Sequence, residues 1–509
     1  METPDSFNDK IWAICDIMRR SNYSGAMGYI ADLTWLLFLR LLDDHEQAEA
    51  EGREALGIPH RYSLEPRYRW SNWAAPDGPL RRELETGPRN AMIDFVDAQL
   101  LPYLRTLHAT ADASDAQRTI SQIVSGIDAI GMDGNKNLLD TLDLLWEIRA
   151  DRSDTASVFA LSQAYEGLLL EMGQTNKDIG QFFTSRMVVS AIVRAIDPKL
   201  GETVYDPCCG TGGFLARAYD YMRRERGDRI TGPELDQLAT DTFYGREKAD
   251  LVYAIALGNL VLHGIEQPNI WHGNTLTGNE SYSGLYHDAP QLFDVILTNP
   301  PFGGKEGADA QQRFTIRSRE TQLLFLQEVI DSLKDGGRAG IVIDEGTLFK
   351  NTNAHRQVRQ KLLDECDLYC VVSLAGGAFT SAGTGVKTNL LFFKKGSPTE
   401  NIWYYEIAPP ADAVGAGGSG NQRTFNKSYP LKLEHFDHFF ELLPSRADSE
   451  RSWSVSIEEI ESRDYDLNAV NPNRPDTTDT RTPSELLDEI ESHSRDLEDA
   501  LADLRQALG

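Results

Sequence analysis

Two short segments of the sequence combine residue types that could carry chemistry. The first, DPCCGTGGF at 206–214, joins an acidic residue to a glycine-rich turn and the start of a helical pattern. The second, NPPFGG at 299–304, follows the apolar run FDVILT. A plain turn after a strand does not need two prolines, an aromatic ring and two glycines together. The second segment is therefore a candidate reaction site.

The first segment is typical of a cofactor-binding turn. A strand that ends at Asp206, a glycine-rich turn and a helix form the geometry that holds a nucleotide-like cofactor at the carboxyl edge of a parallel sheet. The spacing is not G-x-G-x-x-G and no Lys-Ser/Thr pair follows, so the pattern does not indicate a phosphate cradle. An acidic residue before the turn suits a ligand with a cationic amino group. A tight strand-to-helix connection that binds nothing is the alternative interpretation.

Two further polar residues are expected at the ends of neighbouring strands. Glu234 follows the glycine turn by about twenty residues and is predicted at the tip of a strand over 228–234, where a carboxylate can accept bonds from both ribose hydroxyls. Asn274 ends a predicted strand over 269–274, where an adenine edge could be read. For Glu234 taken alone, an ordinary solvated side chain is the alternative.

The second segment has the groups needed to hold an amine on a flat base. The side-chain carbonyl of Asn299 and the backbone carbonyl of Pro300 can both accept hydrogen bonds from one exocyclic amine, and Pro300 and Pro301 stiffen the turn. Phe302 offers a face on which an extruded base can stack. An amine held in this way directs its lone pair toward an electrophilic methyl group, so positioning and desolvation carry the step without a covalent intermediate.

The composition restricts the setting in which this chemistry would occur. The 509 residues suggest about three domains, and hydrophobic and charged contents of 41% and 25% are those of a soluble globular protein. We expect no signal peptide and no membrane span, and five cysteines fit a reducing cytoplasm. The net charge of −28 is unusual for a chain that holds DNA alone. If the chain acts on DNA, its basic residues must gather on one face or a partner must supply the phosphate contacts; a role in solubility alone is the other interpretation.

The elements that must position the two segments form four predicted regions. Residues 1–155 read as a helical domain, because apolar residues recur at three- and four-residue spacing. Residues 156–400 alternate strands with helices, which predicts an α/β fold with a doubly wound, mostly parallel sheet. Residues 401–480 read as loop-rich, and residues 481–509 as a capped amphipathic helix with a Leu and Ile seam. The predicted strands are 203–206, 228–234, 269–274, 293–299, 337–344, 368–374 and 388–395, the last two as an antiparallel pair.

The order of these motifs resembles a known family. DPCCGTGGF followed by NPPF is similar to the amino-methyltransferases that use S-adenosylmethionine, and among them to those that methylate adenine N6 in DNA. IGQFFTSRMVVSAIV at 179–193 resembles the additional cofactor motif of that family. With the helical N-terminal region, LKDGGRAGIVIDEGTLF, VVSLAGGAFTSAGTGVKTNLLFFKKG and the terminal helix, most of the chain resembles the modification subunit of type I restriction–modification systems.

The resemblance implies a Rossmann-like methyltransferase sheet that uses S-adenosylmethionine, with an N-terminal all-helical domain and a C-terminal helix. It implies a cytoplasmic complex on DNA with a specificity subunit that reads the target, two copies of this chain, and a restriction subunit with motor and nuclease activities. The terminal helix would dock on the specificity subunit, and no metal is implied. The implied target-base contacts are Asn299, Pro300, Pro301 and Phe302. The implied cofactor contacts are Gln181, Phe182, Phe183, Thr184, Ser185, Arg186, Asp206, Pro207, Gly210, Thr211, Gly212, Gly213, Glu234 and Asn274.

The chain departs from the family pattern at two positions. Ser185 stands where the family usually has proline, which loosens a turn but keeps the Thr184 hydroxyl. Asn274 stands where the family often has aspartate, and an amide reads the cofactor adenine less selectively.

Other functions remain open at the level of sequence. The chain could be the adenine methylase of another phage-defence system, a methyltransferase for guanine N2 in RNA or for protein glutamine, or a non-catalytic scaffold subunit. Methylation of cytosine C5 through Cys208 is strongly disfavoured, because this cysteine lies inside the cofactor turn and NPPF has no role in that chemistry. Cys208 and Cys209 are expected to be small packed residues.

Overall fold

The computed structural model describes residues 4–473, apart from 22, 24, 111, 149–154, 176–183, 283–288, 380–385, 411–412 and 419–422. It also describes residues 487, 491, 494 and 495 near the C-terminus. The predicted helix over 481–509 therefore lies outside the described residues, apart from these four.

The N-terminal region is helical, as predicted, and its described residues up to 175 contain no strand. In the first helix, Phe7, Ile11, Ile14, Cys15 and Met18 recur at helical spacing and are fully buried, so one stripe of the helix faces the core. The helices of this region are α1 (Pro4–Arg19), α2 (Ala26–Glu54), η1 (Pro66–Tyr68), α3 (Trp70–Trp73), α4 (Pro79–Glu85), α5 (Ala91–Phe95), η2 (Val96–Leu100), α6 (Leu101–Thr106), η3 (Leu107–Ala109), α7 (Asp115–Ile123), α8 (Asn135–Trp146) and α9 (Thr155–Thr175).

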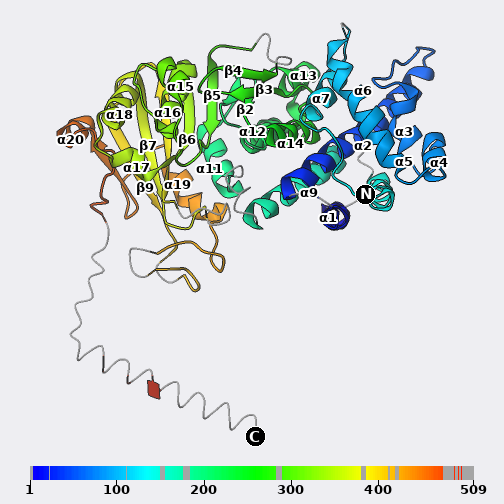
Figure 1. Cartoon of the computed structure of the whole chain (residues 1–509). Helices are drawn as coiled ribbons and strands as arrows, with labels where there is room; N and C mark the ends of the chain where they lie inside the picture. Colours follow the sequence, from blue (N-terminus) through cyan, green and yellow to red (C-terminus); the bar gives the residue numbers. More distant parts are fainter. Residues whose placement is uncertain are drawn as a thin grey trace.

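The rest of the fold is built on one ten-stranded sheet, with strands in the order β10-β9-β7-β8-β6-β5-β1-β2-β3-β4 (Figure 1). Strands β6, β5, β1, β2 and β3 are parallel to one another in this order, and β8 and β4 pair antiparallel with β6 and β3. The bounds are β1 (Val204–Asp206), β2 (Phe243–Glu247), β3 (Asn269–Asn274), β4 (Asn279–Tyr282), β5 (Phe293–Thr298), β6 (Leu333–Asp344), β7 (Cys366–Leu374), β8 (Thr388–Lys395), β9 (Asn401–Ile407) and β10 (Ser452–Ser456).

Helices cover both faces of this sheet, because its strands are apolar on both sides. Along β8, Leu390 and Phe392 join one core cluster, and Leu391 and Phe393 join the other. The first cluster includes α11 (Arg186–Ile196), α12 (Gly213–Arg226) and α14 (Asp250–Leu262), and the second includes α16 (Thr321–Ser332) and α18 (Asn353–Glu365). The remaining helices are η4 (Gly227–Arg229), α13 (Gly232–Thr240), α15 (Ala308–Arg313), α17 (Glu345–Phe349), η7 (Leu433–Phe436), α19 (Asp437–Leu442) and α20 (Ile457–Ser462).

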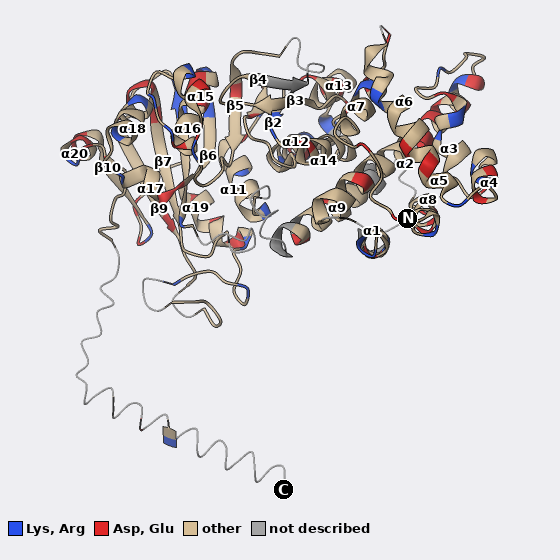
Figure 2. Cartoon of the chain, viewed as in Figure 1, with Lys and Arg blue, Asp and Glu red and all other residues tan. Residues whose placement is uncertain are grey.

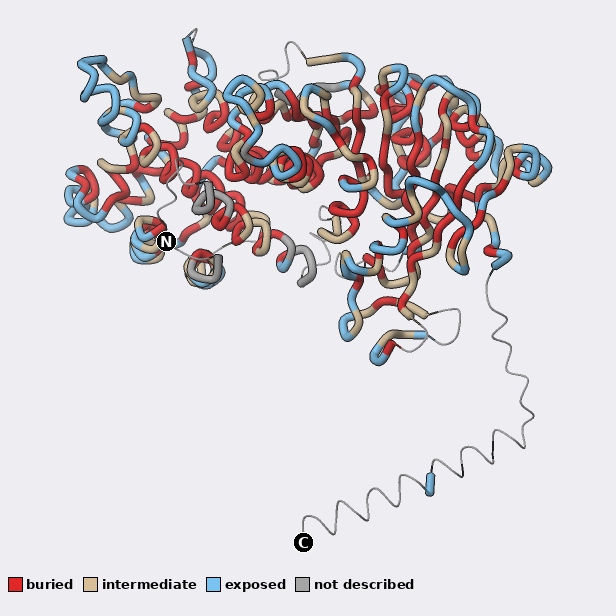
Figure 3. Tube along the Cα trace, turned by 180° about the vertical axis from the view of Figure 1, so that it is seen from behind, coloured by how far each residue is buried: buried red, intermediate tan, exposed pale blue. Residues whose placement is uncertain are grey.

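The helical region and the sheet share one continuous core, visible as buried chain running from one region into the other in Figure 3. Helix α14 packs against α2 so closely that a Cβ on Gly258 would lie 2.1 Å from Cγ2 of Thr34. The Tyr253 hydroxyl on α14 donates to the side-chain carbonyl of Gln122 on α7, at 2.7 Å. The helical region is thus attached to the sheet through α14. No described helix is long and apolar enough to span a bilayer.

Six of the seven predicted strands are confirmed, and so is the antiparallel pairing of 368–374 with 388–395. The prediction of a strand over 228–234 is wrong: this segment contains η4 and the start of α13, and the strand that follows β1 is β2. The loop-rich interpretation of 401–480 is also wrong in part, because β9 and β10 extend the sheet there. Their aromatic residues are buried, with Tyr404 stacked on Trp453 at 5.4 Å.

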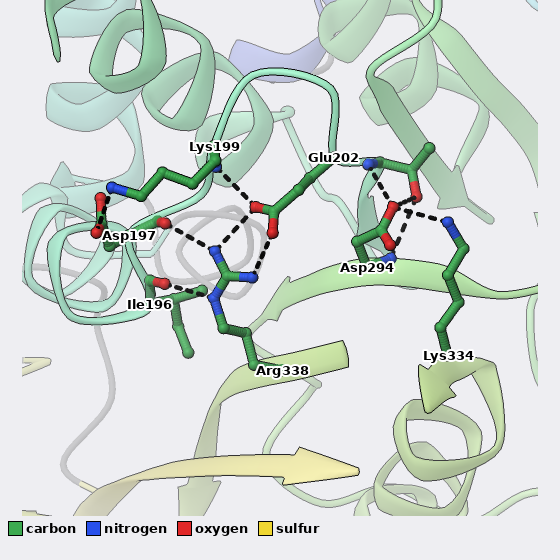
Figure 4. A network of polar contacts seen from close by, with 8 residues as sticks. Ile196, Asp197, Lys199, Glu202, Asp294, Lys334 and Arg338 are labelled. Atoms are coloured by element: carbon green, nitrogen blue, oxygen red, sulfur yellow. Dashed lines mark hydrogen bonds and ion pairs between the residues drawn. The ribbon is translucent and has the colours of Figure 1, made fainter. Parts of the chain in front are cut away.

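A polar network ties α11 to the starts of β1, β5 and β6 (Figure 4). The Arg338 guanidinium donates to both carboxylate oxygens of Glu202, at 2.7 and 2.8 Å, and to the backbone carbonyls of Ile196 and Asp197, each at 2.7 Å. Beside it, the Asp294 carboxylate accepts from the backbone amide and hydroxyl of Thr203 and from Lys334. The amino edge of the sheet is thus held by charge-assisted bonds.

We expect Arg338→Lys to lower the free energy of unfolding by about 1–3 kcal/mol, because an ammonium cannot bind both Glu202 oxygens and two carbonyls in one plane. The matched control is Arg19→Lys, whose ion pair with Asp16 is about half exposed and should contribute almost nothing. Urea denaturation followed by tryptophan fluorescence measures both. Equal midpoints for the two variants would contradict the structural role of Arg338.

Candidate active site

A cavity of about 470 Å³ opens at the carboxyl edge of the sheet. Four neighbouring parallel strands end there, so Asp206, Glu247, Asn274 and Asn299 meet although they lie far apart in sequence. Strand β1 lies between β2 and β5, which is the switch point where ligands bind in open α/β sheets. The NPPF segment follows β5, which pairs directly with β1.

The glycine-rich turn forms the floor of the cavity between β1 and α12. Gly210 and Gly212 have φ angles of 55° and 80°, a conformation that favours glycine, and a Cβ on Gly212 would lie 3.2 Å from Leu260. The Asn259 amide donates to the Thr211 carbonyl at 2.9 Å, and the Gly210 amide donates to Glu247 at 3.1 Å. The turn is therefore held by its neighbours and not only by its own sequence.

Two buried carboxylates lie beside the turn. Asp206 accepts from the Thr298 hydroxyl at 2.7 Å and the Cys208 amide at 3.1 Å, and Glu247 accepts from the amides of Gly210, Lys248 and Ala249. Burial raises the pKa of each carboxyl to about 7 although these bonds favour the charged form, and the Glu247 charge adds to the effect at Asp206. Ligand groups that donate hydrogen bonds or carry positive charge would stabilise both carboxylates.

The prediction that Glu234 ends a strand beside the cofactor is wrong. Glu234 is the third residue of α13, where its carboxylate caps the helix by accepting from the amide and hydroxyl of Thr231, each at 2.9 Å. It also pairs with Arg226 at 2.6 Å, and it is absent from the described lining of the cavity. Bonds from Thr231 and Arg226 lower its pKa. The residue in the predicted place, at the end of the strand after β1, is Glu247.

The NPPF segment contributes an unpartnered acceptor to the cavity. The Nδ2 group of Asn299 donates to the Thr184 hydroxyl at 2.9 Å, while its Oδ1 atom is buried and has no hydrogen-bond partner among the described residues. Pro301 also lines the cavity. The ring of Phe302 is half-buried and packs edge-on against Phe379, with centroids 5.6 Å apart. This contact restricts the orientation of the Phe302 ring.

The predicted site residues other than Glu234 divide into three groups by their position relative to the cavity. Those that line the cavity are Thr184, Arg186, Asp206, Pro207, Gly210, Thr211, Gly213, Asn274, Asn299 and Pro301. Ser185, Gly212, Pro300 and Phe302 adjoin these residues in sequence without belonging to the described lining. Gln181, Phe182 and Phe183 lie outside the described residues. Asn274 uses its Oδ1 atom within its own turn, accepting from the Leu276 amide at 3.0 Å.

Sequence analysis missed several residues of the site. Besides Glu247, these include Glu166 on α9, which pairs with Arg186 and brings the helical region to the cavity edge. The sequence holds only a weak signal for Glu247, because FYGRE begins with two aromatic residues and ends in an acidic one but has Gly245 and Arg246 between them. No signal in the sequence points to Glu166, because its contact with Arg186 joins two separate elements.

The cysteines of the turn are packed, as predicted. The Cys208 thiol lies 3.1 Å from the Thr298 hydroxyl, and burial raises the pKa of both the Cys208 and Cys209 thiols well above the ordinary value. A neutral thiol is a poor nucleophile, which argues against chemistry at these cysteines. Among the described residues, no group of three or more His, Cys, Asp or Glu side chains could hold a metal ion.

Comparisons with known proteins agree with this geometry. Residues 157–480 match the family described as N-6 DNA Methylase, and residues 7–139 match the HsdM N-terminal domain. The chain is 34% identical to the Type I restriction enzyme EcoEI methylase subunit of Escherichia coli, over 99% of this chain and 98% of that protein. It is 27% identical to the EcoKI methylase subunit of E. coli K12, over 90% of this chain and 81% of that protein.

Two solved structures are similar over almost the whole chain. A chain from a study of complex assembly and conformational transition in a type I R-M system has a TM-score of 0.76 and 36% identity, covering 100% of this chain and 99% of that one. A modification subunit assigned to a type I restriction enzyme of Vibrio vulnificus YJ016 has a TM-score of 0.76 and 30% identity, covering 93% and 98%.

The raised pKa of Asp206 predicts how the stability of the fold changes with pH. Between about pH 4 and 7 the folded chain keeps a proton on Asp206 that the unfolded chain has lost, so stability falls as pH rises through this window. Asp206→Asn removes the penalty. We compare the melting temperature of the variant with that of wild type at each pH. This difference should shift in favour of the variant by roughly 2–4 °C between pH 5 and pH 8.

Asp294→Asn is the matched control, with the opposite sign. Burial raises the pKa of Asp294, but bonds from Lys334 and Thr203 outweigh burial and place the pKa below its ordinary value. This variant should melt below wild type at both pH 5 and pH 8, with a nearly constant difference. Scanning calorimetry at the two pH values tests the pair, and a constant difference for Asp206→Asn as well would contradict the buried-charge account.

Proposed function

We propose a mechanism and a set of contacts from one premise: the chain belongs to the N-6 DNA methylase family and, within it, to the methylase subunits of type I restriction enzymes. It is an adenine-specific DNA methyltransferase subunit. The methyl donor that we propose is S-adenosylmethionine. The observation that carries the proposal is the pairing, in one cavity, of an unpartnered Asn299 acceptor with two buried carboxylates beside a glycine turn.

The residues of the cavity fit this donor. In the proposal, Glu247 replaces Glu234 as the carboxylate that accepts from the ribose hydroxyls, because it follows the strand next to the glycine turn. Asp206 binds the amino group of the methionine part, whose positive charge offsets the cost of burying the carboxylate. Asn274 contacts the adenine ring. Its Oδ1 atom is already bonded to Leu276, which leaves Nδ2 as the contact group.

On the other side of the cavity, Asn299 holds the target. A target adenine extruded from the duplex donates its N6 hydrogens to Asn299 Oδ1 and to the Pro300 carbonyl, and stacks on Phe302. The buried Oδ1 atom has no other described partner, so no existing hydrogen bond has to break when it accepts from the amine.

The protein carries the reaction by positioning. Bound in the cavity, the cofactor supplies an electrophilic methyl group on sulfur. Asn299 and Pro300 would hold the amine hydrogens aside and so direct the nitrogen lone pair toward the methyl group that the cofactor would supply. The positively charged nitrogen formed by the transfer would then give up one of its hydrogens as a proton to solvent water. In this proposal Asp206 and Glu247 are occupied by the amino group and the ribose of the donor, so neither serves as a general base.

Sequence reading of the DNA falls to a partner in this proposal. The chain has a net charge of −28, and Figure 2 shows acidic residues prominent along α2, with basic and acidic residues interspersed along α18. Phosphate contacts dominate affinity for DNA, so a separate specificity subunit must supply much of the binding. We propose a cytoplasmic complex with two copies of this chain and, in its complete form, a restriction subunit. Docking through residues 481–509 stays part of this proposal.

The full-length similarity argues against two of the alternatives, methylation of RNA and methylation of protein. A methylase that acts on RNA or protein would not need a helical region of this size, and the match to type I methylase subunits covers that region as well as the sheet.

The experiment that tests the function is methyl transfer from labelled S-adenosylmethionine into DNA, with RNA and protein as parallel substrates, by the chain co-purified with its partner. Asn299→Ala should abolish transfer and leave the cofactor Kd nearly unchanged, because the side chain contacts the base and not the donor. Phe302→Ala should cost roughly 1–3 kcal/mol of stacking, and Phe302→Tyr should keep much of the activity. If Asn299→Ala lost cofactor affinity together with activity, Asn299 would contact the cofactor, and its assignment to the target base would be wrong.

A pair of glutamate variants tests the corrected cofactor site. Glu247→Gln should weaken S-adenosylmethionine binding by roughly 1.5–3 kcal/mol, the value of charge-assisted hydrogen bonds to the ribose. Glu234→Gln removes an equal charge from the surface of α13 and should leave the affinity unchanged. Isothermal titration measures both. A larger loss in Glu234→Gln than in Glu247→Gln would refute the reassignment.

A further inference from the structure

The side-chain amide of Asn299 has a defined orientation. Its Nδ2 group donates to the Thr184 hydroxyl at 2.9 Å, and its Oδ1 atom stays unpartnered and buried. Thr184 comes from the segment before α11, 115 residues earlier in the chain. Both residues line the cavity, so this bond connects two separate segments of its wall.

The orientation matters because the two ends of a primary amide have nearly the same shape and opposite hydrogen-bonding character. Turned by 180°, Asn299 would present N–H groups to an amine that also needs to donate. The contact would then be repulsive and the amine would lose an acceptor. A partner must therefore distinguish the two ends, and among the described residues the partner of Nδ2 is Thr184.

We propose that Thr184 is a positioning residue for the reaction: its hydroxyl accepts from Asn299 Nδ2 and so directs Oδ1 toward the target amine. This inference rests on the proposed function. It assigns Thr184 a role toward the base, in addition to its expected contact with the cofactor. A hydroxyl can also donate, so the orientation requires that the Thr184 proton points away from Asn299, into the cavity that Thr184 lines.

A purely structural role for Thr184 is not supported by its surroundings. The residue that precedes α11 as its N-cap is Ser185, and no side-chain capping bond is present there. The Thr184 side chain is only partly buried. Thr184→Val keeps its shape and removes the acceptor, and Thr184→Ser keeps the acceptor and removes a methyl group.

The first test measures single-turnover methylation at saturating cofactor, with the chain in complex with its partner. Thr184→Val should lower the rate roughly tenfold to a hundredfold, as expected when one hydrogen bond that fixes a reacting geometry is lost. Thr184→Ser should stay within about threefold of wild type. If Thr184→Val weakens cofactor binding but recovers the wild-type rate at saturation, Thr184 serves the cofactor alone and the proposal is overturned.

The second test combines each variant with Asn299→Asp. A carboxylate presents an acceptor in either orientation, so it no longer needs Thr184 to orient it. Thr184→Val should then cost less than about twofold in the Asp background, against its large cost in the Asn background. Equal costs in the two backgrounds would overturn the proposal, because they would show that Thr184 acts independently of Asn299.

A binding measurement covers the case in which Asn299→Asp is itself inactive. The probes are two target duplexes, one with adenine at the modified position and one with purine, which lacks the amine. Thr184→Val should reduce affinity for the adenine duplex to that for the purine duplex, and leave the purine duplex unaffected. Retention of the wild-type preference would refute the role of Thr184. If wild type neither methylates adenine nor prefers it to purine, the proposed function fails instead.

Discussion

The site depends on keeping two carboxylates buried at the end of neighbouring parallel strands. Asp206 and Glu247 lie where water is largely excluded, and neither forms an ion pair with a described cation. Backbone amides and one hydroxyl offset only part of the cost of burying their charge. Each of these donors needs a particular backbone arrangement. The amide of Gly210 in the β1–α12 turn and the amides of Lys248 and Ala249, just before α14, are directed at Glu247 in this way.

At the opposite, amino edge of the sheet, charged side chains pair directly with one another. There Arg338, Glu202, Asp294 and Lys334 pair directly and remain partly exposed, so opposite charges meet and the cost of burial is small. The carboxyl edge carries the proposed chemistry and leaves Asp206 and Glu247 without an ion pair to any described cation, while the amino edge holds the strands in place. A sheet that is apolar on both faces leaves only its two edges for such polar arrangements.

Much of the fold was predictable because its elements carry strong local signals. Periodic apolar residues identified the helical region, and runs such as VILT and LLFF identified the central strands. The turn at 207–212 and the NPPF segment were predicted at the carboxyl ends of strands in one sheet, and the structure brings residues of both to the same cavity. Glu234 was misplaced because Thr231 and Glu234 form a capping box, and a capping box at the end of an apolar-looking run can be mistaken for a strand tip.

The strand β2 was missed because its five residues include Gly245 and Arg246, which weaken the strand signal. Strands β9 and β10 were missed because they follow loop-like composition, and tertiary packing of their aromatic residues decides their state.

Helix α14 has a mechanical consequence for the complete assembly. Gly258 is pressed against Thr34 of α2, and the next residue, Asn259, holds the Thr211 carbonyl of the glycine turn. One helical turn therefore joins the wall of the helical region to the floor of the cavity. Because Gly258 and Thr34 already lie in close contact, a displacement of α2 would press directly on α14. The peptide next to that contact holds the glycine turn, so the turn would be the first part of the cavity to move with the helical region.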